Sequence, residues 1–185
     1  MRTIVVVDYD RNWPAIFDQL HSRIWPVVRE IATSVEHVGS TSVPGLAAKP
    51  IIDISVVVPS EADITAAVER LSTLGYGHQG NLGVNGREAF TSPAASPRQH
   101  LYLCPRDSLA LANHLSVRNY LRAHPDVAHE YGALKKRLAE RFANDIDSYT
   151  DGKTEAILRI LQMAGLRPDE LKTIERINRT VGLTS

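Results

Sequence analysis

The chain has 185 residues, of which 43% are hydrophobic, so it is long and apolar enough to bury the core of one domain. Lys plus Arg and Asp plus Glu number 21 each, which gives a formal net charge of zero. This balance argues against a general nucleic-acid binder or a protein that coats anionic membranes, because both normally carry a basic excess. A single cysteine, Cys104, excludes an intrachain disulfide framework and is predicted to be a buried strand residue.

The apolar patterning at the start of the chain predicts a cytoplasmic protein with no membrane partner. The run from Ile4 to Asp8 is too short for a signal-peptide core, and no apolar run approaches 18 residues. Beyond it, apolar residues recur every three or four positions between residues 13 and 32, which predicts an amphipathic helix. Strands are predicted at 35–38 and 51–58, and a helix at 61–74 with Ser60 as its cap.

The second half of the chain changes from short strands to helices. Residues 75–97 are rich in Gly, Asn, Ser and Pro, and short strands at 82–84 and 88–91 are predicted there, joined by an Asn85-Gly86 hairpin turn. A strand at 100–104 follows, and then helices at 109–123, 125–143, 150–164 and 168–181. The predicted fold is α+β: a small mixed β-sheet with flanking helices in residues 1–105, then a C-terminal helical bundle in 106–185 that packs on this core.

The segment between the first two strands carries the chemical signature of the chain. Gly39 has no Cβ, so backbone N–H groups there can approach a phosphate closely, while Ser40 adds a hydroxyl donor. A short helix beginning near Thr41 or Ser42 would add its positive end. Asp53 follows on the next strand and supplies a hard oxygen ligand suited to Mg²⁺. Together these residues predict that a nucleoside triphosphate and a divalent ion bind between the two strands, although a plain loop and a surface Asp would show the same residues.

The motifs of this chain, taken together, resemble those of the GrpB family, whose members have a DNA polymerase β-like nucleotidyltransferase fold. The matching segments are Asp8-Tyr9-Asp10 with Trp13 and Phe17, Glu36 to Leu46, Lys49 to Asp53, Gly86-Arg87 with Phe90, His100 to Leu103, Arg118 to Pro125, Tyr131 with Lys135, and Tyr149 with Lys153. The resemblance implies transfer of a nucleotidyl group from an NTP to an unknown small-molecule or protein acceptor, with Mg²⁺ or Mn²⁺. The alternative is a non-catalytic module that binds a nucleotide or a CoA-related ligand.

Departures from the superfamily pattern concern the metal site. Ser55 stands where an active nucleotidyltransferase places its second carboxylate, on the same strand face as Asp53. Glu88 is the nearby candidate for a third carboxylate and metal ligand. Within the GrpB pattern, Tyr102 replaces the second His of a His-x-His pair and Asn119 replaces an Asp. Because two-metal chemistry needs bridging acidic ligands, the sequence supports at most one tightly held ion.

Basic residues are the remaining candidates for phosphate contacts. Lys49 directly precedes the Asp53 strand, and Arg87 follows Gly86. Arg118 and Arg122 share a helix face, and Lys135 and Lys153 each follow a tyrosine by four residues. We predict that Lys49, Arg87, Arg118, Lys135 and Lys153 face a triphosphate. The alternative is that they lie on solvated helix faces.

Histidine allows two further interpretations. His100 is a candidate general base toward an acceptor hydroxyl, together with Asp53 and Ser55 as catalytic residues. His37, His100 and His114 could instead form a zinc or iron site of a metal hydrolase, although they lack a short ligand spacing. In a structural role, His37 would brace the Gly-Ser turn through a ring N–H hydrogen bond.

Overall fold

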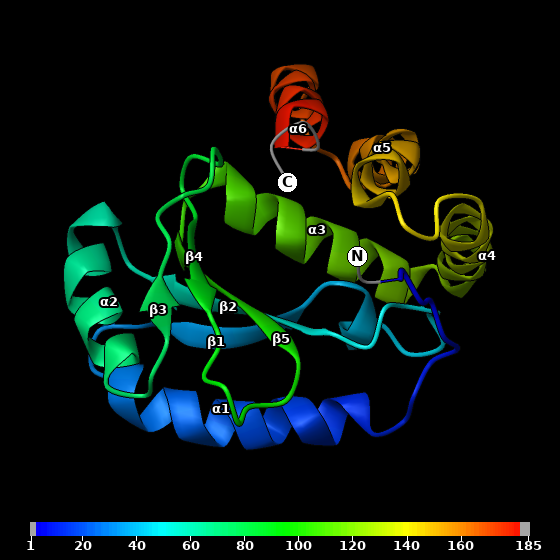
Figure 1. Ribbon diagram of the computed structural model, residues 1–185. Coiled ribbons are helices and arrows are strands. Elements are labelled where there is room, and N and C mark those ends of the chain that lie inside the picture. The colour runs from blue at the N-terminus through cyan, green and yellow to red at the C-terminus, as the bar shows by residue number, and fades with distance from the viewer. Residues whose placement is uncertain (1–2, 182–185) are drawn as a thin grey trace.

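The sheet of this protein has five strands and separates two sets of helices (Figure 1). The computed structural model describes residues 3–181. Its strands are β1 (Ser34–Val38), β2 (Ile52–Val58), β3 (Gly77–His78), β4 (Glu88–Thr91) and β5 (Gln99–Pro105). They lie in the order β1-β2-β5-β4-β3, with β2 and β5 parallel and all other neighbours antiparallel. The sheet is therefore mixed, as predicted.

One face of the sheet packs on α1 (Trp13–Val28) and α2 (Ile64–Ser72). Alternate residues of β2, from Ile52 to Val58, enter the largest hydrophobic cluster together with Leu20 and Ile24 of α1. The residues between them, Asp53 and Ser55, consequently point to the opposite face, because successive side chains of a strand alternate. The period of two in β2 thus places the polar residues of this strand away from the main core.

The opposite face is covered by the C-terminal helices α3 (Leu109–Ala123), α4 (Pro125–Arg141), α5 (Ile146–Met163) and α6 (Pro168–Val181). Ser108 caps α3 by accepting a hydrogen bond from the Leu111 amide, and Asp145 caps α5 by accepting one from the Ser148 amide. Among the described residues 3–181, no helix is long and apolar enough to cross a bilayer.

Most predicted elements form, but their boundaries differ. The first helix ends at Val28 instead of residue 32, and Pro26 lies inside its last turn. The predicted helix 61–74 is divided into a 3₁₀ turn, Glu61–Asp63, and α2, with Ser60 and Asp63 forming a capping box. The helix predicted at 125–143 ends at Arg141, and the one predicted at 150–164 begins earlier, at Ile146, because Asp145 is its cap.

The strand predicted at 82–84 is wrong. Leu82 and Gly83 both have positive φ angles, 48° and 79°, which a strand does not contain. β4 pairs instead with the two-residue strand β3, His78 lying opposite Phe90. Cys104 is fully buried in β5, as predicted.

Candidate functional site

The Gly-Ser turn and Asp53 meet at the edge of β1 and β2. Val38 lies directly opposite Asp53 in the antiparallel register, so the Gly-Ser turn, which starts at Gly39, begins beside the Asp53 carboxylate. A Cβ atom on Gly39 would lie 2.1 Å from Asp53 Oδ2, and the φ of Gly39 is 68°. Only glycine therefore fits here, because a side chain would be both strained and in collision. The predicted juxtaposition of the turn and Asp53 is confirmed.

The residues after Gly39 form a single 3₁₀ turn, Ser40–Ser42, that is braced from both sides. Thr41 is 1% exposed, and its hydroxyl donates to the Ile51 carbonyl (3.2 Å) and lies 3.0 Å from His37 Nε2. A hydroxyl has one proton, so the His37 ring donates to it. His37 also stacks on Phe17 of α1 at 4.6 Å, and burial lowers its pKa to about 4. Thr41 and His37 thus brace the turn, and their polar atoms are already engaged.

Three lysines from different parts of the chain surround Asp53. Lys49 precedes β2, Lys135 lies on α4, and Lys153 lies on α5. They line one pocket, the lysine pocket, with a volume of about 220 Å³, whose walls are Ser40, Thr41, Ala48, Lys49, Ile51, Asp53, His100, Tyr131, Lys135, Tyr149 and Lys153. The predictions that Ser40, Lys49, Asp53, His100, Lys135 and Lys153 share a site agree with this geometry.

The lysine pocket holds its ammonium groups against aromatic faces. Lys153 Nζ lies 4.3 Å from the centre of the Tyr149 ring and Lys49 Nζ 5.6 Å from the same ring, while Lys135 Nζ lies 4.7 Å from that of Tyr131. Lys135 is 3% exposed and donates to Ser40 Oγ at 2.7 Å. Burial, reinforced by repulsion from Lys153, lowers the pKa of Lys135 to about 7, and burial with repulsion from Lys49 lowers that of Lys153 to about 8.

Charge in the pocket is unbalanced. None of the three lysines forms an ion pair among residues 3–181, and Asp53 is the one carboxylate that lines the pocket. Asp53 in turn accepts a hydrogen bond from His100 Nδ1 at 2.8 Å. Three ammonium groups beside a single carboxylate leave an excess of positive charge, which an anion bound in the pocket would neutralise.

His100 is oriented by Asp53. Because the carboxylate can only accept, Nδ1 of the ring is the donor, and Nε2 of the neutral ring is left with its lone pair. The side chain is 47% exposed and faces the lysine pocket. This arrangement is chemically suited to proton abstraction, and the role of His100 as a general base stays a prediction.

Ser55 does not contact the pocket. It is fully buried, and its Oγ lies 3.0 Å from Nδ1 of His114 on α3. Burial, aided by repulsion from Arg87, lowers the pKa of His114 to about 4, so this ring is neutral. The prediction that Ser55 acts as a catalytic residue is therefore corrected: its hydroxyl contacts His114 inside the protein, and a residue with no exposed surface cannot meet substrate.

Glu88 lies on the wrong face of the sheet for a metal shared with Asp53. It is opposite Leu103 in β5, whose side chain enters the cluster beneath α1 and α2. Its Oε2 pairs with His78 Nε2 at 2.6 Å. The prediction that Glu88 is a metal ligand is corrected, because directly opposed residues of an antiparallel pair share one face and Asp53 occupies the other.

Two of the predicted phosphate-binding arginines are engaged elsewhere. Arg118 is partly buried and joins α3 to β1, because it donates to Glu36 Oε2 at 2.7 Å and to the His37 carbonyl at 3.1 Å. Arg87 stacks on Tyr102, with its guanidinium carbon 4.6 Å from the ring centre. Neither lines the lysine pocket, so neither is placed to contact a phosphate in it.

The donor atoms around Asp53 fit one divalent ion but not two. Asp53 is the one carboxylate of the pocket, and Mg²⁺ can be held by one or two carboxylates when substrate phosphates complete its shell. Across residues 3–181 no group of three or more His, Cys, Asp or Glu side chains is arranged to hold a metal ion. The three-histidine hydrolase site is also excluded for this part of the chain, because His37 packs against α1 on the other face of the sheet.

Tyr131 and Tyr149 form the aromatic walls on which the lysines rest, as their spacing of four residues from Lys135 and Lys153 predicted. One feature of the region was not predicted. Asn113 of α3 and Asn178 of α6 line the adjoining cleft with Gly39, Ser40 and Asp53. No motif marks these asparagines, because they come from helices that meet only in the folded chain.

Comparison with known proteins identifies relatives along most of the chain. The family described as "GrpB protein" matches residues 3–163. Among relatives, the UPF0157 protein YqkA of Bacillus subtilis is 35% identical over 156 residues, which are 84% of this chain and 46% of that protein. The glutamate-rich protein GrpB of Alkalihalophilus pseudofirmus is 36% identical and covers 85% of this chain and 94% of its own length. This chain thus spans less than half the length of the first relative and nearly all of the second.

Solved structures extend the comparison to the fold. The crystal structure of GrpB from Enterococcus faecalis matches with a TM-score of 0.78 and 34% identity, covering 91% of this chain and 98% of that one. A structure of Cid1 in complex with its short product ApU matches with a TM-score of 0.55 and 14% identity, over 80% of this chain and 49% of that one. At this identity the likeness concerns the fold alone. The family match over residues 3–163 and the relatives at 35–36% identity show that the chain belongs to the GrpB family, and its sheet and helices have a nucleotidyltransferase-like fold.

Proposed function

We propose that this protein binds the phosphate groups of a nucleotide in the lysine pocket, and that ammonium groups supply most of the positive charge. One observation carries the proposal: Lys135 is 3% exposed, without an ion-pair partner among residues 3–181, and aimed at Ser40 in the Gly-Ser turn. A phosphate bound there would meet Lys49, Lys135 and Lys153 and would repay their desolvation. The nucleotidyltransferase-like fold supports a nucleotide as the ligand.

A second candidate is nucleotidyl transfer, favoured by the contact between Gly39 and Asp53. In this reaction an acceptor oxygen attacks the α-phosphorus of an NTP, the bond to the pyrophosphate oxygen breaks, and pyrophosphate leaves. His100 Nε2 takes the proton of the acceptor hydroxyl, and Asp53 stabilises the imidazolium through Nδ1. Asp53 would also hold one Mg²⁺ or Mn²⁺, which supplies charge neutralisation at the phosphates when bound. The lysines align the phosphate chain and stabilise its charge.

Calorimetric titration with ATP and with CoA, in EDTA and in Mg²⁺, separates the two candidates. Lysine-based binding predicts that ATP binds in EDTA and that Asp53→Asn retains or strengthens binding, because a negative charge beside the phosphates is removed. Transfer predicts that binding needs Mg²⁺ and is lost in Asp53→Asn. Preference for CoA over ATP would instead identify a CoA-related ligand.

The lysines are tested by a matched pair of neighbours on α4. Lys135→Met should weaken ATP binding at least tenfold, about 1.4 kcal/mol. Lys136→Met is the control, because Lys136 points away and pairs with exposed Asp8. Equal affinities of the two variants, or no binding of ATP by the unsubstituted protein, would contradict the proposal.

A further inference from the structure

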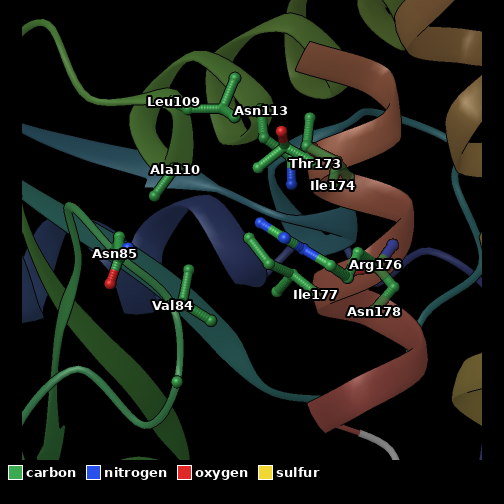
Figure 2. Close-up of a pocket in the computed structure, with 11 residues that line it drawn as sticks. Val84, Asn85, Leu109, Ala110, Asn113, Thr173, Ile174, Arg176, Ile177 and Asn178 are labelled. Atoms are coloured by element: carbon green, nitrogen blue, oxygen red, sulfur yellow. The ribbon is translucent and has the colours of Figure 1, made fainter. Parts of the chain in front are cut away.

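A cavity of about 350 Å³ lies between α3, α6 and the loop that precedes β4 (Figure 2). Its walls are apolar, from Val84 and Ala110 on one side to Ile174 and Ile177 of α6 on the other. Asn85, Asn113 and Asn178 add carboxamide groups to these walls, and Arg176 of α6 adds a guanidinium group. We call this space the asparagine cavity. Apolar walls with a few amide groups are typical of small-molecule sites.

The asparagine cavity is linked to the lysine pocket by a cleft of about 210 Å³. This central cleft shares Ser40, Asp53 and Tyr131 with the lysine pocket. At its other end it shares Asn113 and Asn178 with the asparagine cavity. The three spaces therefore follow one another between the sheet and the C-terminal helices, with three lysines at one end and apolar and amide groups, together with Arg176, at the other.

We propose that the asparagine cavity receives the nucleoside part of the ligand whose phosphates occupy the lysine pocket, so that one molecule fills both ends. This inference rests on the proposed function and adds the site that distinguishes a nucleotide from a bare phosphate chain. A carboxamide offers two N–H donors and an oxygen acceptor, which matches the mixed donors and acceptors of a nucleobase edge. The apolar walls provide surfaces for its ring faces.

The position of α6 makes the cavity a specificity element of this chain. The GrpB family match ends at residue 163, whereas α6 begins at Pro168 and contributes Ile174, Ile177 and Asn178 to the wall. Figure 2 shows Ile177 on the side of α6 that faces the loop with Val84. A change in α6 is therefore expected to alter which nucleoside binds without altering the lysine pocket.

The test compares ATP with tripolyphosphate, which has the same phosphate chain and no nucleoside. Calorimetric titration of the full chain should give an affinity for ATP at least tenfold higher than that for tripolyphosphate. Ile177→Trp fills the cavity and should remove this advantage, while tripolyphosphate affinity stays unchanged and shows that the lysine pocket is intact. Asn113→Leu, which keeps the branched outline of the side chain but removes the amide, should reduce the advantage severalfold. Lys172→Trp, at an exposed position of the same helix, is the control and should leave both affinities unchanged.

Tripolyphosphate binding as tight as that of ATP would overturn the inference and leave the proposed function standing. An ATP advantage that persists in both Ile177→Trp and Asn113→Leu would also overturn it. If neither compound binds the unsubstituted protein, the proposed function fails and this inference fails with it.

Discussion

Replacement of Gly39 by alanine tests the geometry on which the whole site depends. The new Cβ would lie 2.1 Å from Asp53 Oδ2 and 2.8 Å from both Cβ and Cγ of that residue. A methyl group forced into a packed contact costs about 1–3 kcal/mol. The positive φ of Gly39 adds about 1–2 kcal/mol for a residue with a side chain. We therefore expect Gly39→Ala to lower the free energy of unfolding by about 2–5 kcal/mol, the sum of both costs.

Gly45→Ala is the matched control for this substitution. Gly45 also has a positive φ, 79°, but a Cβ there would have no atom within 4 Å. Its cost should be the backbone part alone, about 1–2 kcal/mol. Urea unfolding followed by the fluorescence of Trp13 and Trp25, which both pack in the main core, measures both variants.

A double-mutant cycle isolates the collision with Asp53. Asp53→Gly removes the atoms that the new Cβ would meet. The double variant with Gly39→Ala should therefore be more stable, by about 1–3 kcal/mol in the free energy of unfolding, than the sum of the two single effects predicts. Gly39→Ala should also weaken ATP binding, because Asp53 or the turn must move. The reasoning is refuted if Gly39→Ala is no more destabilising than Gly45→Ala and the cycle shows no coupling.

Three further predictions concern buried groups around the site. Because the pKa of Lys135 falls to about 7 in the folded state, the unfolded chain binds more protons between about pH 7 and 10.5. The buried lysine therefore destabilises the fold most below pH 7, and this destabilisation fades as pH rises. At pH 7, Lys135→Met should raise the free energy of unfolding by up to a few kcal/mol, at about 1.36 kcal/mol per pKa unit, and urea unfolding should show this increase shrinking toward pH 10. A constant difference across that range would contradict it. Arg118→Ala should lower the free energy of unfolding by about 1–3 kcal/mol, because it leaves the partly buried Glu36 and the His37 carbonyl without their donor, whereas Lys136→Ala should cost about 0–1 kcal/mol. Preserved stability of Arg118→Ala with lost ATP binding would restore Arg118 as a phosphate ligand. Ser55→Ala should cost about 1–3 kcal/mol by leaving His114 Nδ1 without its buried partner, and calorimetry should give unchanged ATP affinity; a loss of affinity at full stability would return Ser55 to the site.

The sequence by itself determined the local features of this protein. Alternation in β2 separates Ile52 and Ile54 from Asp53, and the Gly39-Ser40 turn ends the strand that pairs with β2. These features depend on residues that are close in the sequence and on the pairing of two consecutive strands, so they could be predicted from the sequence. The membership in the GrpB family follows from the same segments.

Only the tertiary structure decided which polar residues share a pocket. The side of the sheet on which Glu88 lies depends on the register between β4 and β5, which no local pattern states. Lys135 and Lys153 come from two different helices, and their convergence on Ser40 and Asp53 depends on how those helices pack on the sheet. The ion pair between Arg118 and Glu36 also depends on this long-range packing, because residues distant in the sequence come into contact only when the whole chain folds.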